Sequence, residues 1–265
     1  TRDRVTQIRW GIADYEHHFG KPPEGMWLAE TAADAASLEL MAQNGIKFTV
    51  LAPHQCKRVR PLKEAVTAAS PTETGLPVPA NWTDTPNATV DTTRPYLARF
   101  ASGASIAVFF YNGPVSRAVA FEGLLNSGED FAARLKGAFK DAAQPQLVHI
   151  ATDGESYGHH HKYGDMALAY ALNLLDRDRN VRLTNYASYL EQFPPACECE
   201  IVDNTSWSCV HGVERWRSNC GCNGGKVGWN QLWRTPLRQA LDELRDALAP
   251  LTEEEGRKYF RDVWA

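Results

Sequence analysis

The sequence predicts an α/β fold built on a parallel sheet. Segments typical of buried strands alternate with segments typical of amphipathic helices over the first 193 residues, and this alternation is characteristic of parallel strands covered by helices. The 265 residues are 43% hydrophobic and 23% charged, which is enough apolar chain for one large domain with a proper core.

The first half of the chain opens on a helix. Apolar residues recur every three or four positions over 5–19, and Gly20 would end that helix. A capping pattern of Thr31 and Asp34 predicts a second helix that runs to Gly45. Strands are predicted at 26–28, 46–51, 96–100 and 106–111, with a hairpin connection over 101–105.

A long segment without regular structure interrupts the alternation of strands and helices, which then continues until the composition of the chain changes. Residues 67–93 are rich in Thr, Pro and Asn without a period, which predicts a long loop or lid over a cleft. From Pro194 the chain is rich in Cys, Trp and Gly. The remaining predicted elements are helices at 115–125, 127–140, 166–175, 236–248 and 252–264, strands at 146–150 and 181–184, and a helical stretch that ends at Phe193.

Charge and hydropathy restrict the partners and the compartment. A net charge of −4 supplies no positive field for a polyanion, so we expect no nucleic-acid partner. No apolar run approaches the roughly 20 residues of a membrane span, and no signal-type segment follows the basic start. We therefore expect a cytoplasmic protein that acts without a membrane on a neutral or weakly charged substrate.

Residues 151–161 place two acids and three histidines on one short loop. The loop follows the predicted strand 146–150, and ligands bind at the carboxyl ends of such strands. Asp153 is flanked by Glu155, whose charge disfavours a second ionised carboxylate, so Asp153 can hold a proton near neutrality. The alternative is a polar loop whose aspartate caps the next helix and whose histidines are solvated.

Five of the six cysteines lie between residues 197 and 222. Three of them together with His211 could complete a tetrahedral set for zinc: Cys209, Cys220 and Cys222. Their spacing is Cys-x-Cys, whereas the familiar zinc spacing is Cys-x2-Cys, so ordinary free thiols are the preferred interpretation, ahead of a metal site or disulfides. We expect no bound metal and no cofactor.

Two motifs resemble the signatures of glycoside hydrolase family 57: residues 25–30, Gly-Met-Trp-Leu-Ala-Glu, and residues 153–158, Asp-Gly-Glu-Ser-Tyr-Gly. The likeness covers most of the chain, and residues 109–114 and 204–216 are similar to a poorly characterised branch of that family. The resemblance implies an incomplete (β/α)7 barrel with C-terminal helices that acts on α-glucans by a retaining mechanism, as a hydrolase or transglycosylase.

The resemblance also assigns roles to residues of the two motifs. Asp153 would be the general acid/base, Trp27 a flat apolar face for a sugar ring, and Glu30 an acceptor for sugar hydroxyls. We expect Glu155 and His159 to contact the carbohydrate substrate as well. A core position on a strand is the alternative for Trp27.

Two departures from the family pattern set further expectations. The chain lacks the family's first strand with its His-Gln-Pro-type motif, which predicts a barrel fragment, and the position of the family's nucleophile falls on Gly113. Retention requires a second carboxylate, for which Glu214 is preferred over Glu122, a surface position on a helix. Glu214 lies among three further expected substrate contacts: Trp207, His211 and Trp216.

These expectations define the domains and the rival functions. Residues 1–193 would form the barrel portion, including the loop at 67–93, and residues 194–265 would complete the same domain. One rival is a metal-dependent, deacetylase-like hydrolase in which Asp153, His159 and His161 hold the metal and Glu155 is the base. Another is a catalytically degenerate homologue that binds glycan, which the glycine at 113 favours.

Overall fold

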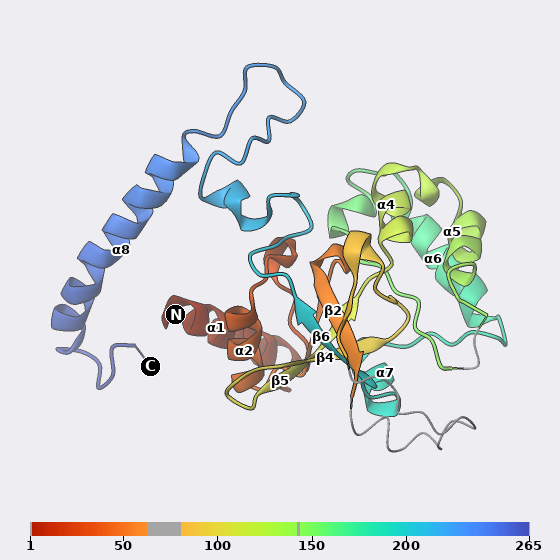
Figure 1. Ribbon diagram of the computed structural model, residues 1–265, viewed down its shortest axis with the longest axis horizontal. Helices are drawn as coiled ribbons and strands as arrows, with labels where there is room; N and C mark the ends of the chain where they lie inside the picture. The colour runs from red at the N-terminus through yellow and green to blue at the C-terminus, as the bar shows by residue number, and fades with distance from the viewer. Residues whose placement is uncertain (1, 63–80, 142–143, 265) are drawn as a thin grey trace. The chain divides into compact units, whose positions relative to one another are not determined.

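A computed structural model describes residues 2–62, 81–141 and 144–264 (Figure 1). The chain divides into two compact units, Thr1–Asp203 and Asn204–Ala265. The predicted loop at 67–93 lies partly outside the described residues, because its description begins at residue 81. The sequence-based view that residues 194–265 complete one domain stays a prediction.

The first unit is built around a mixed sheet. In the described residues its order is β1-β5-β4-β6-β2-β3, and β1 pairs in parallel with β5 and β4 with β6, while the other pairs are antiparallel. The α/β class is thus confirmed, but the sheet is only partly parallel. The strands are β1 (Phe48–Leu51), β2 (Cys56–Pro61), β3 (Thr83–Asp84), β4 (Pro95–Arg99), β5 (Ser105–Phe110) and β6 (Cys197–Ile201).

Strand β5 separates two environments. It forms the predicted hairpin with β4, in which Phe100 N–H donates to the Ala104 carbonyl at 3.0 Å. Because side chains alternate along a strand, Ile106, Val108 and Phe110 point into one buried cluster. Phe109 points the other way, where its ring contacts those of Phe48, His149 and Tyr186.

Strand β2 is an element that sequence patterning missed. It pairs with β6, and two arginines lie directly opposite two glutamates. Arg58 bonds both carboxylate oxygens of Glu200 at 2.7 and 2.8 Å, and Arg60 Nε donates to Glu198 at 2.9 Å. Such cross-strand pairs of opposite charge stabilise an antiparallel pair, although their sequence separation makes them invisible to local periodicity.

Helices α1 (Arg2–Phe19) and α2 (Ala35–Gln43) pack against one face of the sheet. Ile8 of α1 and Leu38 and Met41 of α2 are buried in the cluster with β5. The predicted capping pattern is corrected in detail: Asp34 itself is the N-cap and accepts a 2.7 Å hydrogen bond from Ser37 N–H.

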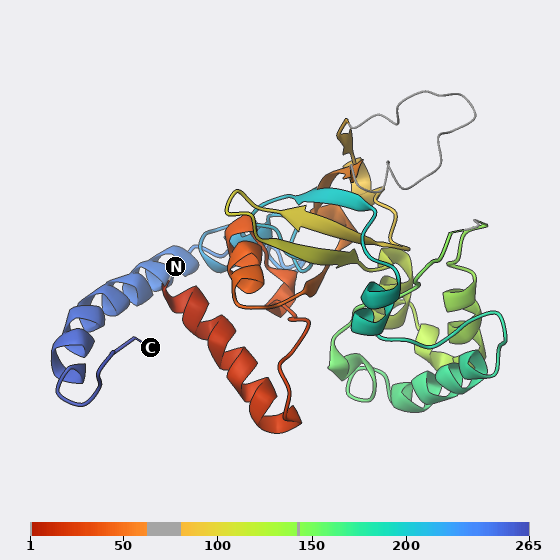
Figure 2. The ribbon, with the colours of Figure 1, turned by 90° about the horizontal axis from the view of Figure 1, so that it is seen from below.

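A second layer is formed by three helices that share their own core (Figure 2). These are α4 (Gly113–Phe121), α5 (Gly128–Lys136) and α6 (Gly164–Asp176). Phe131, Val119 and Ala171, one from each helix, are fully buried there. The short α7 (Tyr186–Gln192) begins at an Asn185 N-cap whose side chain accepts from Ser188 N–H.

Three predicted strands are absent from the sheet. Residues 26–28 belong to no strand, and the preceding Gly25 forms an isolated bridge with Phe48. Residues 146–150 and 181–184 have no regular pairing; Leu147 N–H donates to Thr93 and the His149 carbonyl accepts from Asn112 N–H. Apolar composition alone was therefore a wrong signal for ladder formation in these segments.

The second unit contains α8 (Arg234–Gly256), where two helices were predicted. Pro250 lies inside α8 and forgoes one backbone donor, yet the helix continues, so the predicted capping box at Thr252 is wrong. No described helix of the chain has the length and apolar character needed to span a membrane.

The described residues also form short 3-10 helices. These are Ala29–Thr31, Pro53–Gln55, Pro86–Ala88, Leu124–Asn126, Gly154–Ser156 and the longer Gly212–Trp216.

Candidate active site

Asp153 lies at the wall of a pocket of about 500 Å³ in the first unit. It precedes the 3-10 turn Gly154–Ser156, and its side chain makes no capping hydrogen bond there. The carboxylate is therefore not used as a helix cap, which was the structural alternative for this residue. Trp27, Val50, Tyr157 and Tyr186 line the same pocket.

The surroundings of Asp153 favour its protonated form. Partial burial raises the pKa of this carboxyl above its usual range, and the negative charges of Glu30 and Glu155 raise it further, against a smaller opposite effect of His160. A carboxylic acid that keeps its proton to higher pH is suited to protonating a leaving group. The sequence anticipated the contribution of Glu155, and the structure adds that of Glu30.

Glu30 reaches this position through an uncommon backbone conformation. Glu30 and Thr31 have φ values of 56° and 49°, in the left-handed region that L-residues other than Asn and Asp rarely adopt. Thr31 is fully buried, and its carbonyl accepts a 2.7 Å hydrogen bond from Gln55 Nε2. Strained residues held by their surroundings cluster at functional sites.

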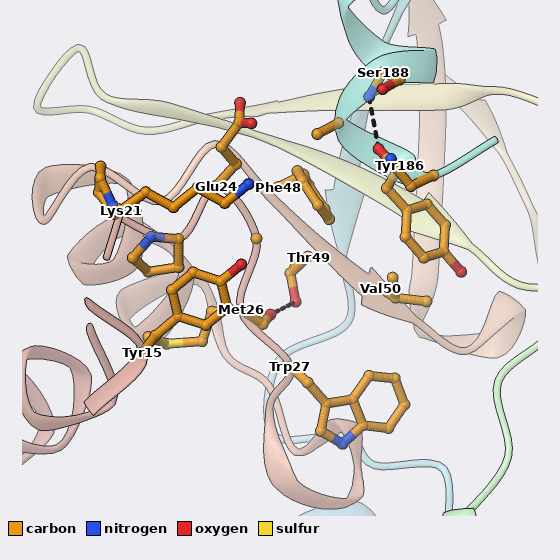
Figure 3. Close-up of a pocket in the computed structure, with 15 residues that line it drawn as sticks. Tyr15, Lys21, Glu24, Met26, Trp27, Phe48, Thr49, Val50, Tyr186 and Ser188 are labelled. Atoms are coloured by element: carbon orange, nitrogen blue, oxygen red, sulfur yellow. Dashed lines mark hydrogen bonds between the residues drawn. The ribbon is translucent and has the colours of Figure 1, made fainter. Parts of the chain in front are cut away.

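A second pocket, of about 530 Å³, adjoins the first (Figure 3). Both pockets are lined by Trp27, Val50 and Tyr186, and Figure 3 shows Val50 between the two aromatic rings. The side chain of Trp27 is 46% exposed, so it is not the core aromatic that was the alternative interpretation. Its role as a sugar platform stays a prediction.

Tyr186 and its support were missed by sequence reasoning. The Tyr186 hydroxyl lies 3.0 Å from Nδ1 of His149, which is buried beneath the pocket. Burial raises the pKa of Tyr186 to about 12 and lowers that of His149 to about 4. Both groups are therefore neutral near pH 7, and their contact fixes the Tyr186 ring where it lines the pocket. Tyr186 lies two residues after the predicted strand 181–184, which is the signal that could have identified it.

The three histidines of the acidic loop do not converge. The rings of His159 and His160 are 5.0 Å apart, whereas His161 Nε2 lies 2.9 Å from the Ala120 carbonyl. Within the described ranges, Asp153, His159 and His161 do not gather into a group that could hold a metal ion. The geometry thus gives no support to a deacetylase-like metal site.

The remaining predicted site residues lie in the second unit. Glu214 bonds Arg217 and Ser218 with its two carboxylate oxygens, and these contacts lower its pKa. His211 lies beside cysteine side chains. Trp216, at the end of a 3-10 helix, is 40% exposed and Trp207 is partly buried.

Two positions bear on the second carboxylate. Gly113 is the first residue of α4, directly after the Asn112 N-cap, and offers no side chain. Glu122 is exposed at the end of the same helix and pairs with Arg117 at 2.8 Å. Glu122 therefore occupies the surface position that was expected.

Comparison with known families decides where the chain belongs. Residues 1–201 match the family described as Glycosyl hydrolase family 57. The chain belongs to this family. Residues 229–265 match a domain of unknown function, DUF3536. The sequence matches none of the curated proteins with which it was compared.

Solved structures share the fold at low sequence identity. An exo-type maltose-forming amylase from Pyrococcus sp. ST04 superposes with a TM-score of 0.70 at 14% identity, over 99% of this chain and 45% of that one. A branching enzyme from Thermococcus kodakaraensis gives 0.58 at 18%, over 81% and 48%. A 4-alpha-glucanotransferase from Thermococcus litoralis gives 0.52 at 17%, over 77% and 28%.

The family 57 chain described here therefore spans less than half the length of these enzymes. The shared fold confirms the predicted fold class: the chain covers part of the (β/α)7 barrels of these enzymes, and its described sheet is mixed.

Proposed function

We propose that this chain carries the acid/base half of a carbohydrate-active site that cleaves or transfers α-glycosidic bonds in glucans or oligosaccharides. The observation that supports it most is the raised pKa of Asp153 in a pocket lined by Trp27 and Tyr186. Family 57 membership agrees, and so do the activities named for the similar structures, an amylase, a branching enzyme and a glucanotransferase.

In this proposal Asp153 donates its proton to the glycosidic oxygen as the bond to the anomeric carbon breaks, and takes a proton from the acceptor in the second half of the reaction. Trp27 and Tyr186 supply apolar faces on which sugar rings stack. Glu30 accepts hydrogen bonds from sugar hydroxyls. Its negative charge also raises the pKa of Asp153.

The second carboxylate is proposed from two candidates. Glu214 is ionised and fixed by Arg217 and Ser218, as a base or nucleophile requires, and Trp207 and Trp216 would bind sugar beside it. Glu30 is the candidate in the same unit as Asp153. A large fall of turnover in Glu214→Gln would assign the role to Glu214, and turnover equal to that of wild type would exclude Glu214 from it.

The test of the proposal is the Asp153→Asn variant assayed for reducing ends and transfer products on maltooligosaccharides. We expect turnover to fall at least about 100-fold, the usual contribution of a positioned general acid. Asp176→Asn is the matched control, because it makes the same change at an exposed position in the last turn of α6. Near wild-type turnover in the Asp153 variant would exclude its proposed role.

A second candidate is a glycan-binding homologue without turnover, and the glycine at position 113 favours it. This candidate predicts that maltooligosaccharides bind to the wild-type chain while no bond is cleaved or transferred. Calorimetry combined with the reducing-end assay separates the two functions. Binding that weakens in Trp27→Ala, together with no detectable product, would select the binder.

A further inference from the structure

The six cysteines form two separate groups in the structure. Cys56, Cys197 and Cys199 pack in the core of the first unit against the sheet, as ordinary buried thiols do. The other three lie in the second unit, where they meet one imidazole. We call this group the Cys3His cluster: Cys209, His211, Cys220 and Cys222.

The donor atoms of the Cys3His cluster have the spacing of a tetrahedral metal site. All four lie within 4.8 Å of one another. The Sγ atoms of Cys209 and Cys222 are 3.4 Å apart, and His211 Nδ1 is 3.5 Å from the first and 3.6 Å from the second. Zinc bonds of about 2.3 Å to sulfur and about 2.0 Å to nitrogen place two sulfur donors about 3.8 Å apart in a tetrahedron, and a sulfur and a nitrogen donor about 3.5 Å apart.

The backbone gathers these donors from two short loops. His211 N–H donates to Cys209 Sγ at 3.4 Å, which holds the first pair together. Gly221 has a φ of 88° between Cys220 and Cys222, a conformation that glycine adopts without strain. Gln231 Nε2 donates to the Cys222 carbonyl at 3.0 Å and anchors the second loop.

The second unit has little else to stabilise it. Its buried described residues are Ser206, Cys209 and Gly212, and α8 has none. Small units that bury little apolar surface need a metal, a disulfide or an additional partner to fold. One disulfide would use two of the thiols and leave the third beside the imidazole, whereas a metal ion would use all four donors.

We infer that the Cys3His cluster is a structural zinc site. Three thiolates and one neutral imidazole form a tetrahedral sulfur and nitrogen set typical of Zn²⁺. Binding releases the three thiol protons to solvent. The four donors leave no open position for water, so the ion would stabilise the second unit and take no part in bond cleavage. This inference is independent of the proposed function, and it reverses the expectation of free thiols and of His211 as a sugar contact.

The first test is the metal content of the full chain. Protein purified under reducing conditions and reconstituted with Zn²⁺ is expected to hold about one zinc ion per chain by mass spectrometry. Replacement by Co²⁺ should give the intense visible bands of tetrahedral cobalt thiolate. A reduced wild-type chain that binds no zinc, stoichiometric iron in its place, or a cobalt spectrum without thiolate bands would overturn the inference.

Variants identify the ligands. Cys209→Ser and Cys222→Ser should each weaken zinc binding by more than about 100-fold, beyond the 10- to 100-fold that loss of an outer hydrogen-bond partner costs. Cys197→Ala is the control, because it removes a thiol outside the cluster, and it should keep full zinc content. Zinc retained at wild-type affinity in both serine variants would also refute the site. The cobalt spectrum of the wild-type chain needs no variant and remains decisive if a variant fails to fold.

Discussion

The buried His149 makes the stability of the first unit depend on pH. Burial lowers the pKa of this imidazole from 6.5 to about 4, and the backbone of Thr92 and Phe110 offsets only part of the effect. Above pH 6.5 the ring is neutral in both the folded and the unfolded chain. Between pH 6.5 and about 4 the unfolded chain binds a proton that the folded chain does not. The free energy of unfolding therefore decreases as the pH is lowered through this range.

The size of this loss follows from the shift. A change from 6.5 to about 4, at 1.36 kcal/mol for each unit, corresponds to about 3 kcal/mol of unfolding free energy. His149→Gln removes the titration and also some packing against Phe109 and Tyr186. The packing loss is the same at both pH values. The unfolding free energy of wild type minus that of the variant should therefore decrease by about 3 kcal/mol from pH 7 to pH 4.

Urea unfolding followed by circular dichroism at pH 7, 5.5 and 4 measures this difference. His17→Gln on the exposed face of α1 is the control, and it should leave the pH dependence of wild type unchanged. A His149→Gln variant whose stability runs parallel to that of wild type over the whole range would refute the reasoning. It would show that the imidazole is charged in the folded chain or unprotonated in both states.

Two further predictions concern the pocket. Glu30→Gln and Glu155→Gln each remove a charge that raises the pKa of Asp153, so the alkaline limb of kcat/KM should move to lower pH in both, and an unmoved limb would contradict the electrostatic role of these acids. Gly113→Glu should fold, because an added Cβ would meet Pro53 Cγ at an ordinary 3.6 Å, and it should raise hydrolysis above that of Gly113→Gln if the site lacks only a nucleophile. Equal activity of the two Gly113 variants would show that position 113 does not face the bond.

Local periodicity predicted the helices of the first unit well, because an apolar stripe is a property of neighbouring residues. It failed where the decisive partner is remote. Strand β2 carries three basic residues in the run Cys-Lys-Arg-Val-Arg-Pro, and only the glutamates of β6 make such a strand stable. Residues 146–150 are apolar enough for a strand, yet their position beside Asn112 and Thr93 allows single hydrogen bonds without a ladder.

The acidic loop was predictable because Asp153 and Glu155 are two residues apart in sequence, and charge repulsion at that separation needs no tertiary information. The contributions of Glu30 and Tyr186 depend on how distant segments meet, and no spacing rule contains that. The Cys3His cluster is a further case in which spacing along the chain did not predict how side chains meet in the fold. Its spacing argued against a metal, while the left-handed Gly221 gives the two thiols around it a common direction.

Side chains of strand β5 alternate between two faces, so substitutions along this one strand have two different effects. Ile106, Val108 and Phe110 lie in the hydrophobic cluster that unites the sheet with α1 and α2, so substitutions there alter how much of the protein is folded. Phe109 lies against Tyr186 and His149, so substitutions there alter the shape of the pocket floor. A mutant library confined to Ile106, Val108 and Phe110 would sample the amount of folded protein, whereas changes at Phe109 would sample the packing behind Tyr186, within the same six residues of chain.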